Sequence, residues 1–251
     1  MKKVAIVTGG ASGIGKSIAE ALSQEGLDVI VADMQEEAGL VVAEAISGVF
    51  IKTDLSKRDS CRQLVDQVIR DFGRIDILIN NAGFQHVSPI GDFSEDKWDQ
   101  MLAVMLTAPF LLTKYVWPCM TKQKWGRIIN MASIHGLVAS PNKAAYVSAK
   151  HGLIGLTKAA ALEGGEHGIT VNALCPSYVR TPLVENQIAD LAKENKVDEN
   201  EVLENVLLKS AAIKNLIEPK EISSLVLFLC SDNGASITGA SWTIDCGWTA
   251  Q

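Results

Sequence analysis

An α/β fold built on one doubly wound parallel sheet of about seven strands is predicted for residues 1–251 by three features of the sequence. Short apolar runs alternate with longer segments of helical periodicity along the chain. A glycine-rich turn joins the first apolar run to the first helical segment. No repeat, linker or low-complexity segment breaks the alternation, so a single domain is expected.

The first strand, turn and helix predict a phosphate-binding site. Residues 3–8 form an apolar run, and 16–24 have helical spacing with Gly26 as a stop. Glycines in the intervening turn let a ligand approach the backbone, and the helix N-terminus offers unpaired N–H groups and a positive dipole end. This context favours a dinucleotide pyrophosphate. The predicted contacts are Gly9, Ser12, Gly13, Ile14 and Gly15.

The second apolar run, 28–33, ends in a carboxylate, Asp33, eighteen residues beyond Gly15. A carboxylate at this strand end accepts hydrogen bonds from a ribose diol and repels a 2′-phosphate, so it favours NAD over NADP. The alternative is an Asp that only completes a turn. After this glycine turn, the ribose role is the better interpretation.

The alternation continues toward the middle of the chain. Helices are expected at 36–46 and 56–72, and strands at 49–52 and 75–79. Turns follow these strands at the expected ligand rim: Asp54 and Leu55, both predicted cofactor contacts, come after the third strand, and Asn80, Asn81, Ala82 and Gly83 after the fourth.

A long helix is predicted next, with Ser94 as its N-cap, acidic residues in its first turn and an end near Val116. Pro109 lies inside it. Because proline lacks an N–H, the carbonyl of residue 105 loses its normal helical partner and a kink is expected.

The second half of the chain repeats the alternation of strands and helices and adds a segment that is expected to cover the ligand site. Its strands are expected at 127–132, 170–175 and 241–245, and its helices from Tyr146 through Leu162 and from Pro219 to Cys230. Residues 178–216 are rich in charge and helix formers and interrupt the rhythm. We interpret this segment as a small helical lid, which would exclude water from a reaction.

Right-handed crossovers place the carboxyl ends of all parallel strands along one rim of the sheet. The glycine turn, Asp33, Asp54 and the Asn80–Gly83 turn all follow strands directly. A ligand is therefore expected at that rim.

Ser133, Tyr146 and Lys150 predict acid–base chemistry at the same rim. Tyr146 and Lys150 lie one helical turn apart on a shared face, so the ammonium is expected to lower the pKa of the phenol and allow proton exchange. Ser133 ends a buried strand and can hydrogen-bond a substrate oxygen. The alternatives are a solvated helix face for the Tyr–Lys pair and a turn role for Ser133.

Composition excludes several classes of protein. The net charge is −6 with no basic stripe, which argues against nucleic-acid binding, and no apolar stretch approaches the ~20 residues of a membrane helix. The scattered cysteines, with no C-x-x-C spacing, predict reduced, mostly buried thiols in a cytoplasmic protein, and no metal site is expected. They are Cys61, Cys119, Cys175, Cys230 and Cys246.

Over its whole length the chain resembles the short-chain dehydrogenase/reductase family. The motifs that carry the resemblance are Thr8-Gly9-x-x-x-Gly13-x-Gly15, Asp54, Asn80-Asn81-Ala82-Gly83, Ser133, Tyr146-x-x-x-Lys150 and Pro176-x-x-x-x-Thr181. The resemblance implies a Rossmann-type fold, Tyr146 as general acid/base, Ser133 orienting the substrate oxygen, and Lys150 holding the nicotinamide ribose and lowering the pKa of Tyr146. It also implies cofactor contacts from Asn81, Ala82, Gly83, Tyr146, Pro176, Val179 and Thr181.

Within that family the chain shows a closer resemblance to the bacterial D-3-hydroxybutyrate dehydrogenases. The similar segments are 83–89, 135–141, 181–187 and 244–251. This resemblance implies that Gln85, His135, Lys143 and Gln187 surround a substrate carboxylate, which needs a cation and several donors to replace its lost water. Taken singly, each has a plain structural alternative in a loop, a turn or the lid surface. Trp248 has two equal interpretations, pocket wall and core.

The activity implied is NAD-dependent, reversible oxidation of (R)-3-hydroxybutyrate to acetoacetate, with a small hydroxy acid as substrate. A homotetramer is also implied, with the C-terminal segment near a subunit interface. The alternatives are a sugar-alcohol dehydrogenase or 3-oxoacyl thioester reductase of the same family, and a catalytically silent nucleotide-binding regulator.

Two positions depart from the family pattern. Ser177 stands where the family usually has Gly. Met105 stands where many relatives carry an Asn of a catalytic tetrad, and its thioether cannot take part in a proton relay. We hypothesise that Pro109 compensates, because its missing N–H leaves the Met105 carbonyl free to bind a relay water.

Overall fold

The computed structural model describes residues 2–195 and 197–250, which form one Rossmann-like α/β domain. A seven-stranded sheet in which every pair is parallel runs in the order β3-β2-β1-β4-β5-β6-β7. The strand order reverses between β1 and β4, which confirms the predicted doubly wound sheet. The strands are β1 (Val4–Thr8), β2 (Asp28–Asp33), β3 (Val49–Lys52), β4 (Ile77–Asn80), β5 (Gly126–Met131), β6 (Ile169–Pro176) and β7 (Ser241–Ile244).

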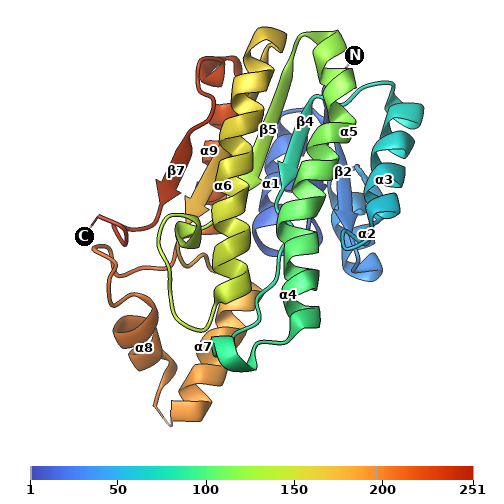
Figure 1. Ribbon diagram of the computed structural model, residues 1–251. Coiled ribbons are helices and arrows are strands. Elements are labelled where there is room, and N and C mark those ends of the chain that lie inside the picture. The colour runs from blue at the N-terminus through green and yellow to red at the C-terminus, as the bar shows by residue number, and fades with distance from the viewer. Residues whose placement is uncertain (1, 196, 251) are drawn as a thin grey trace.

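Helices cover both faces of the sheet (Figure 1). One face carries α1 (Gly13–Gln24), α2 (Glu36–Ala45) and α9 (Pro219–Cys230), and the other carries α3 (Arg58–Phe72), α4 (Glu95–Leu102), α5 (Ala108–Gln123) and α6 (Ala144–Gly164). Side chains of β1 alternate between two apolar cores: Val4 and Ile6 pack against α3 and α5, while Ala5 and Val7 pack against α1 and α9. Burial on both faces explains why the strands are continuously apolar.

Helices α4 and α5 join through a π-helical turn, Ala103–Thr107, in which the Ala108 N–H bonds the Ala103 carbonyl. The irregularity that the sequence predicts around Pro109 is therefore present in this helix. It takes the form of a wider turn just before Pro109, which lies within the first two positions of α5.

Residues 95–123 form one helical run that is long and apolar enough, by length and composition, to cross a membrane. Many of its apolar side chains face the protein interior instead, whereas Phe110 is exposed. Met101, Met105 and Leu112 are each at most 1% exposed, and the run packs against α3 and α6. Core packing accounts for its apolar composition.

The lid segment, residues 178–216, lies beyond the carboxyl ends of the strands and contains α7 (Pro182–Asn195), α8 (Glu199–Val202) and a π-helical turn, Leu203–Leu207 (Figure 1). Backbone bonds between Arg180 and Ile217 and between Ile217 and Tyr178 join its two ends. Its buried side chains form an apolar cluster separate from the two main cores: Ile188, Ala192, Val202, Leu207, Leu208, Ala211 and Leu216.

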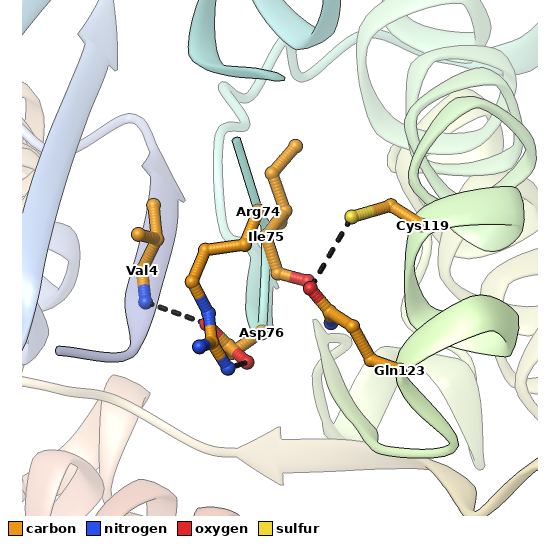
Figure 2. Close-up of polar contacts among 6 residues, drawn as sticks. All are labelled: Val4, Arg74, Ile75, Asp76, Cys119 and Gln123. Atoms are coloured by element: carbon orange, nitrogen blue, oxygen red, sulfur yellow. Dashed lines mark hydrogen bonds and ion pairs between the residues drawn. The ribbon is translucent and has the colours of Figure 1, made fainter. Parts of the chain in front are cut away.

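At the amino ends of the strands, an ion pair between the partly exposed Arg74 and the buried Asp76 fixes the start of β4 (Figure 2). The Arg74 guanidinium donates two hydrogen bonds to the Asp76 carboxylate, at 2.7 and 2.5 Å, and the Val4 N–H donates a third at 2.8 Å. Gln123 at the end of α5 donates to the Ile75 carbonyl at 3.0 Å. These bonds hold β1, β4 and α5 together at the amino ends of the strands.

We predict that Asp76→Asn lowers the free energy of unfolding by about 2 kcal/mol, because it weakens the charge-assisted hydrogen bonds that the buried Asp76 carboxylate accepts from Arg74 and Val4. Urea unfolding followed by circular dichroism measures the change. Asp28→Asn is the matched control, since Asp28 forms only a 3.8 Å pair with the exposed Lys2 and should change stability by less than about 1 kcal/mol. Equal effects of the two substitutions would contradict this prediction.

Candidate active site

A cleft of about 630 Å³ opens at the carboxyl edge of the sheet and brings the predicted site residues together. Gly15 is the exception, because it lies beneath the glycine turn and does not line the cleft. The predicted residues that line it are Gly9, Ser12, Gly13, Ile14, Asp33, Asp54, Leu55, Asn81, Ala82, Gly83, Gln85, Ser133, His135, Lys143, Tyr146, Lys150, Pro176, Val179, Thr181 and Gln187.

The glycine turn forms a close-packed cradle at the start of α1. Gly9 and Gly13 have φ of +64° and +52°, which favour glycine. A Cβ on Gly15 would lie 2.1 Å from the Gly9 carbonyl oxygen, so Gly15 acts by letting the turn pack on the helix. A Cβ on Gly9 would lie 2.9 Å from the Ala82 Cα, where β4 ends.

The N-terminus of α1 is open to an anion. Ser12 occupies the N-cap with extended backbone, its side chain makes no capping hydrogen bond, and the first turn contains no acidic residue. The first-turn N–H groups and the positive dipole end therefore face the cleft without a competing carboxylate. A phosphate fits this position.

Asp33 at the end of β2 is held in place by two backbone donors, the Ala11 N–H at 3.1 Å and the Gln35 N–H at 3.0 Å. The bond to Ala11 links the carboxylate directly to the glycine turn. The alternative that Asp33 only completes a turn is therefore insufficient, because the same carboxylate also lines the cleft. The N-terminus of α1 and the Asp33 carboxylate line the same cleft, an arrangement that fits a dinucleotide with its pyrophosphate at α1 and a ribose at Asp33.

Asn81 joins the ends of β1 and β4 beneath the cleft. Its side-chain amide donates to the Thr8 carbonyl at 2.9 Å and to the Gly9 carbonyl at 3.2 Å. The Thr8 hydroxyl in turn accepts the Asn81 N–H at 2.9 Å and donates to the Ile79 carbonyl at 3.1 Å. The asparagine thus holds the glycine turn against the next strand, a role that its position after a strand does not reveal.

Ser133, Tyr146 and Lys150 converge, as predicted, where β5 ends and α6 begins. Lys150 is 3% exposed, and its ammonium donates to the Met131 carbonyl at 2.6 Å. Burial lowers the pKa of Lys150 to about 8. The alternative of a solvated Tyr–Lys pair is wrong, because this part of the helix faces the cleft and the core.

The expected direction of the Tyr146 pKa is wrong for the protein without ligand. Burial raises the pKa of Tyr146, while a hydrogen bond from Ser133 opposes the rise. The Lys150 ammonium lies 5.5 Å from the centre of the tyrosine ring and is directed at the Met131 carbonyl. Desolvation of the phenolate is therefore the largest influence on the Tyr146 pKa, which sequence spacing alone does not reveal.

The cleft contains a cation without a counter-charge, Lys143, on the side where His135 lies. Lys143 is half-buried, and among the described residues its ammonium has no hydrogen-bond or ion-pair partner; burial lowers its pKa. The Nε2 of Gln85 is buried and likewise lacks a partner in the described structure. Gln187 approaches from α7. These groups supply a charge and donors to a small anion.

His135 lies between Ser133 and Ser140. Its Nδ1 is 3.5 Å from the Ser133 Oγ, its Nε2 is 2.8 Å from the Ser140 Oγ, and its backbone N–H donates to Ser133 at 3.2 Å. Burial first, and then the nearby Lys143 and His151, lower the pKa of His135 to about 4. The imidazole is therefore neutral at pH 7 and adds no positive charge.

Trp248 is not among the cleft-lining residues. It packs against the lid cluster, with its ring centre 6.4 Å from that of His135. Other lining residues were not predicted, including Phe84, Lys97, Gln100, Val104 and Tyr178. Lys97 and Gln100 lie one turn apart on α4, and nothing in their spacing distinguishes them from a solvated helix face.

A family model described as enoyl-(acyl carrier protein) reductase matches residues 9–249. The oxidoreductase YxjF of Bacillus subtilis is 48% identical over 100% of this chain and 99% of its own. The chain belongs to the short-chain dehydrogenase/reductase family. Two D-beta-hydroxybutyrate dehydrogenases are also similar: that of Rhizobium meliloti is 43% identical over 100% of both chains, and that of Cupriavidus necator 41% identical over 99% of this chain and 98% of its own.

This short-chain dehydrogenase/reductase is thus a nicotinamide-dependent oxidoreductase.

The two positions that depart from the family pattern both lie in or beside the cleft. Ser177 lines it. Met105 is 1% exposed and packs with Ala145 and Ala149, next to Tyr146, and its sulfur would lie 3.2 Å from a Cβ on Gly83. The thioether fills space and offers no proton to a relay.

The Pro109 hypothesis predicts that Pro109→Ala slows turnover several-fold and leaves the Kd of NAD unchanged. The new N–H would bond the Met105 carbonyl and remove it as a site for a relay water. Pro118→Ala, which restores an N–H in the exposed part of the same helix, is the matched control. Steady-state rates and NAD titration measure both effects, and unchanged turnover in Pro109→Ala would rule the hypothesis out.

Proposed function

We propose that this enzyme catalyses the NAD-dependent, reversible oxidation of (R)-3-hydroxybutyrate to acetoacetate. The observation that carries the proposal is the uncompensated Lys143 ammonium at the end of the cleft that holds Ser133 and Tyr146. A half-buried cation without a counter-charge favours an anionic substrate, because pairing recovers part of its lost hydration. Similarity to two D-beta-hydroxybutyrate dehydrogenases supports the same substrate.

The side chains divide the chemistry between them. Ser133 holds the substrate hydroxyl, and the phenolate form of Tyr146 takes the hydroxyl proton as the carbonyl forms. Lys150 supports Tyr146 and the nicotinamide ribose. Gln85, Lys143 and Gln187, with His135 as the resemblance implies, hold the carboxylate and orient the carbinol carbon. NAD, when bound, supplies the hydride acceptor.

NAD rather than NADP is proposed on the charge of Asp33. Both of its carboxylate oxygens are already fixed by backbone N–H groups, so the side chain does not need to reorganise to receive a ribose diol. The same fixed negative charge would repel a 2′-phosphate.

The proposal includes a homotetramer in the cytoplasm that acts on a free hydroxy acid, with no nucleic-acid or membrane partner. Exposed apolar side chains on the outer helices, Phe110 on α5 and Leu162 on α6, supply surface for contacts between subunits.

A 3-oxoacyl thioester reductase is the second candidate, favoured by the description of the matching family model. A silent nucleotide-binding regulator is disfavoured because Ser133, Tyr146 and Lys150 are assembled in one cleft.

The proposal predicts NADH formation, measured at 340 nm, with (R)-3-hydroxybutyrate and NAD, and at least tenfold lower kcat/KM with the S enantiomer or with NADP. Acyl thioesters and polyols are tested in parallel. Activity confined to thioesters or polyols would reject the substrate, whereas a preference for NADP would reject the role given to Asp33. NAD binding with no turnover of any alcohol would favour the silent regulator.

Lys143→Gln should raise the KM for the acid at least tenfold, equivalent to about 1.4 kcal/mol, with little change in the Kd of NAD. In the unaltered enzyme, the KM should rise with pH as Lys143 loses its proton. This loss should begin below the ordinary lysine range, because burial lowers the Lys143 pKa. Lys158→Gln, an exposed position on the same helix, is the control. A KM independent of both substitution and pH would contradict a carboxylate contact.

A further inference from the structure

A second hollow opens beside the position proposed for the cofactor ribose. It is more open than the cleft and shares Met34 and Gln35 with it, and its other lining residues come from α2 and from Lys52 at the end of β3. Met34 directly follows Asp33 in the chain. A ribose held by Asp33 would therefore have free space next to it, and volume alone would not keep out a phosphate on that ribose.

Lys52 lies next to Asp33 on the neighbouring strand. The two residues are paired in register where β2 and β3 end, so their side chains point to the same face of the sheet. The Lys52 side chain is 64% exposed, and its ammonium is a group that commonly binds phosphate in proteins. Taken alone, this lysine would favour NADP, against the charge of Asp33.

Glu36 in the first turn of α2 holds this ammonium in an ion pair. The Lys52 Nζ donates to the Glu36 carboxylate at 2.8 Å. Gly39 allows the approach, because α2 lies so close to β3 that a Cβ on Gly39 would lie 2.1 Å from a carbon of the Phe50 ring. The close packing of this helix on this strand thus places Glu36 beside Lys52, and the pair takes up the positive charge that a phosphate would need.

The N-terminus of α2 is acidic, whereas that of α1 is not. Glu36 and Glu37 both lie in the first turn of α2, and α1 has no acidic residue in its first turn. Carboxylates in a first turn offset the positive end of the helix dipole, which would otherwise attract an anion. Together with Asp33, these carboxylates give this end of the cleft a net negative charge despite Lys52.

We propose that the Glu36–Lys52 ion pair is a second determinant of cofactor choice, an inference that rests on the NAD preference proposed for this enzyme. Glu36 keeps the Lys52 ammonium paired, so that a 2′-phosphate would meet Asp33 and Glu37 without a free cation to bind it. A ribose with a free 2′-hydroxyl brings no charge to this position. The second hollow therefore excludes NADP by charge and not by volume.

Removal of the Glu36 charge tests the proposal. Glu36→Gln should free Lys52 and lower the Kd of NADP by roughly fivefold or more, as expected for one cation close to a phosphate in a solvated site, with little change in the Kd of NAD. The double variant with Lys52→Gln should lose this gain and bind NADP about as weakly as the unaltered enzyme. Fluorescence titration with each cofactor measures the Kd values with no alcohol present. Because the pair is exposed and stabilises the fold little, circular dichroism should show that all variants are folded.

Asp71→Asn is the matched control. Asp71 forms an exposed ion pair with Arg70 at 3.6 Å, in the last turn of α3, which leads to the amino end of β4. The substitution removes the same charge far from the ribose position, so both Kd values should stay unchanged. Raising NaCl from about 0.02 M to about 0.5 M should reduce the gain in Glu36→Gln, because salt screens exposed charges. A gain caused by altered packing would not respond to salt in this way.

Two results would overturn the proposal: an unchanged Kd of NADP in Glu36→Gln, or an equal gain in Glu36→Gln and in the double variant, which would leave Lys52 without a part. Failure of the proposed function gives different results. An unaltered enzyme that binds NADP more tightly than NAD would reject the NAD preference, and one that ignores (R)-3-hydroxybutyrate would reject the substrate. In both cases the comparison of Glu36→Gln with the double variant still decides the role of the ion pair.

Discussion

The hydrogen bond from the Lys150 ammonium to the Met131 carbonyl is the interaction on which the site depends most. It joins the second turn of α6 to the last residue of β5, and so brings Tyr146 opposite Ser133. A series of buried hydrogen bonds also connects β4, β5 and α6. Asn80 donates to Asn130, Asn130 donates to Thr157, and Thr157 donates to the Leu153 carbonyl. The register of two strands and one helix thereby determines the geometry of proton transfer.

Charge within the cleft is unevenly distributed. Asp33 places a negative charge at the end near the glycine turn, and Lys143 places a positive one near Tyr146, while the His135 imidazole between Ser133 and Ser140 stays neutral. Burial lowers the pKa of both His135 and Lys143, so the low polarisability of the surroundings matters as much as the identity of the residues. The proposed ribose and substrate positions therefore carry opposite charges.

Much of the architecture was predictable because it depends on local patterns. Continuous apolar runs gave β2 and β3 with their observed limits, and the glycine turn located the start of α1 to within three residues, at Lys16 instead of Gly13. Features that need three-dimensional burial were not predictable. The Arg74–Asp76 pair resembles two ordinary surface charges in sequence, and the raised pKa of Tyr146 depends on the side chains that cover it. The contact of His135 with Ser140 depends on a loop whose path no periodicity describes.

The separate apolar cluster of the lid segment has an evolutionary consequence. Because its buried side chains pack mainly on one another, with Tyr178 and Trp248 at the margin, they contribute little to the two cores that hold the sheet. The paired backbone of Arg180 and Ile217 closes the segment at its base. Mutations can therefore accumulate above that base and reshape the substrate end of the cleft without eroding the stability of the sheet. Specificity in such a chain can diverge faster than its fold.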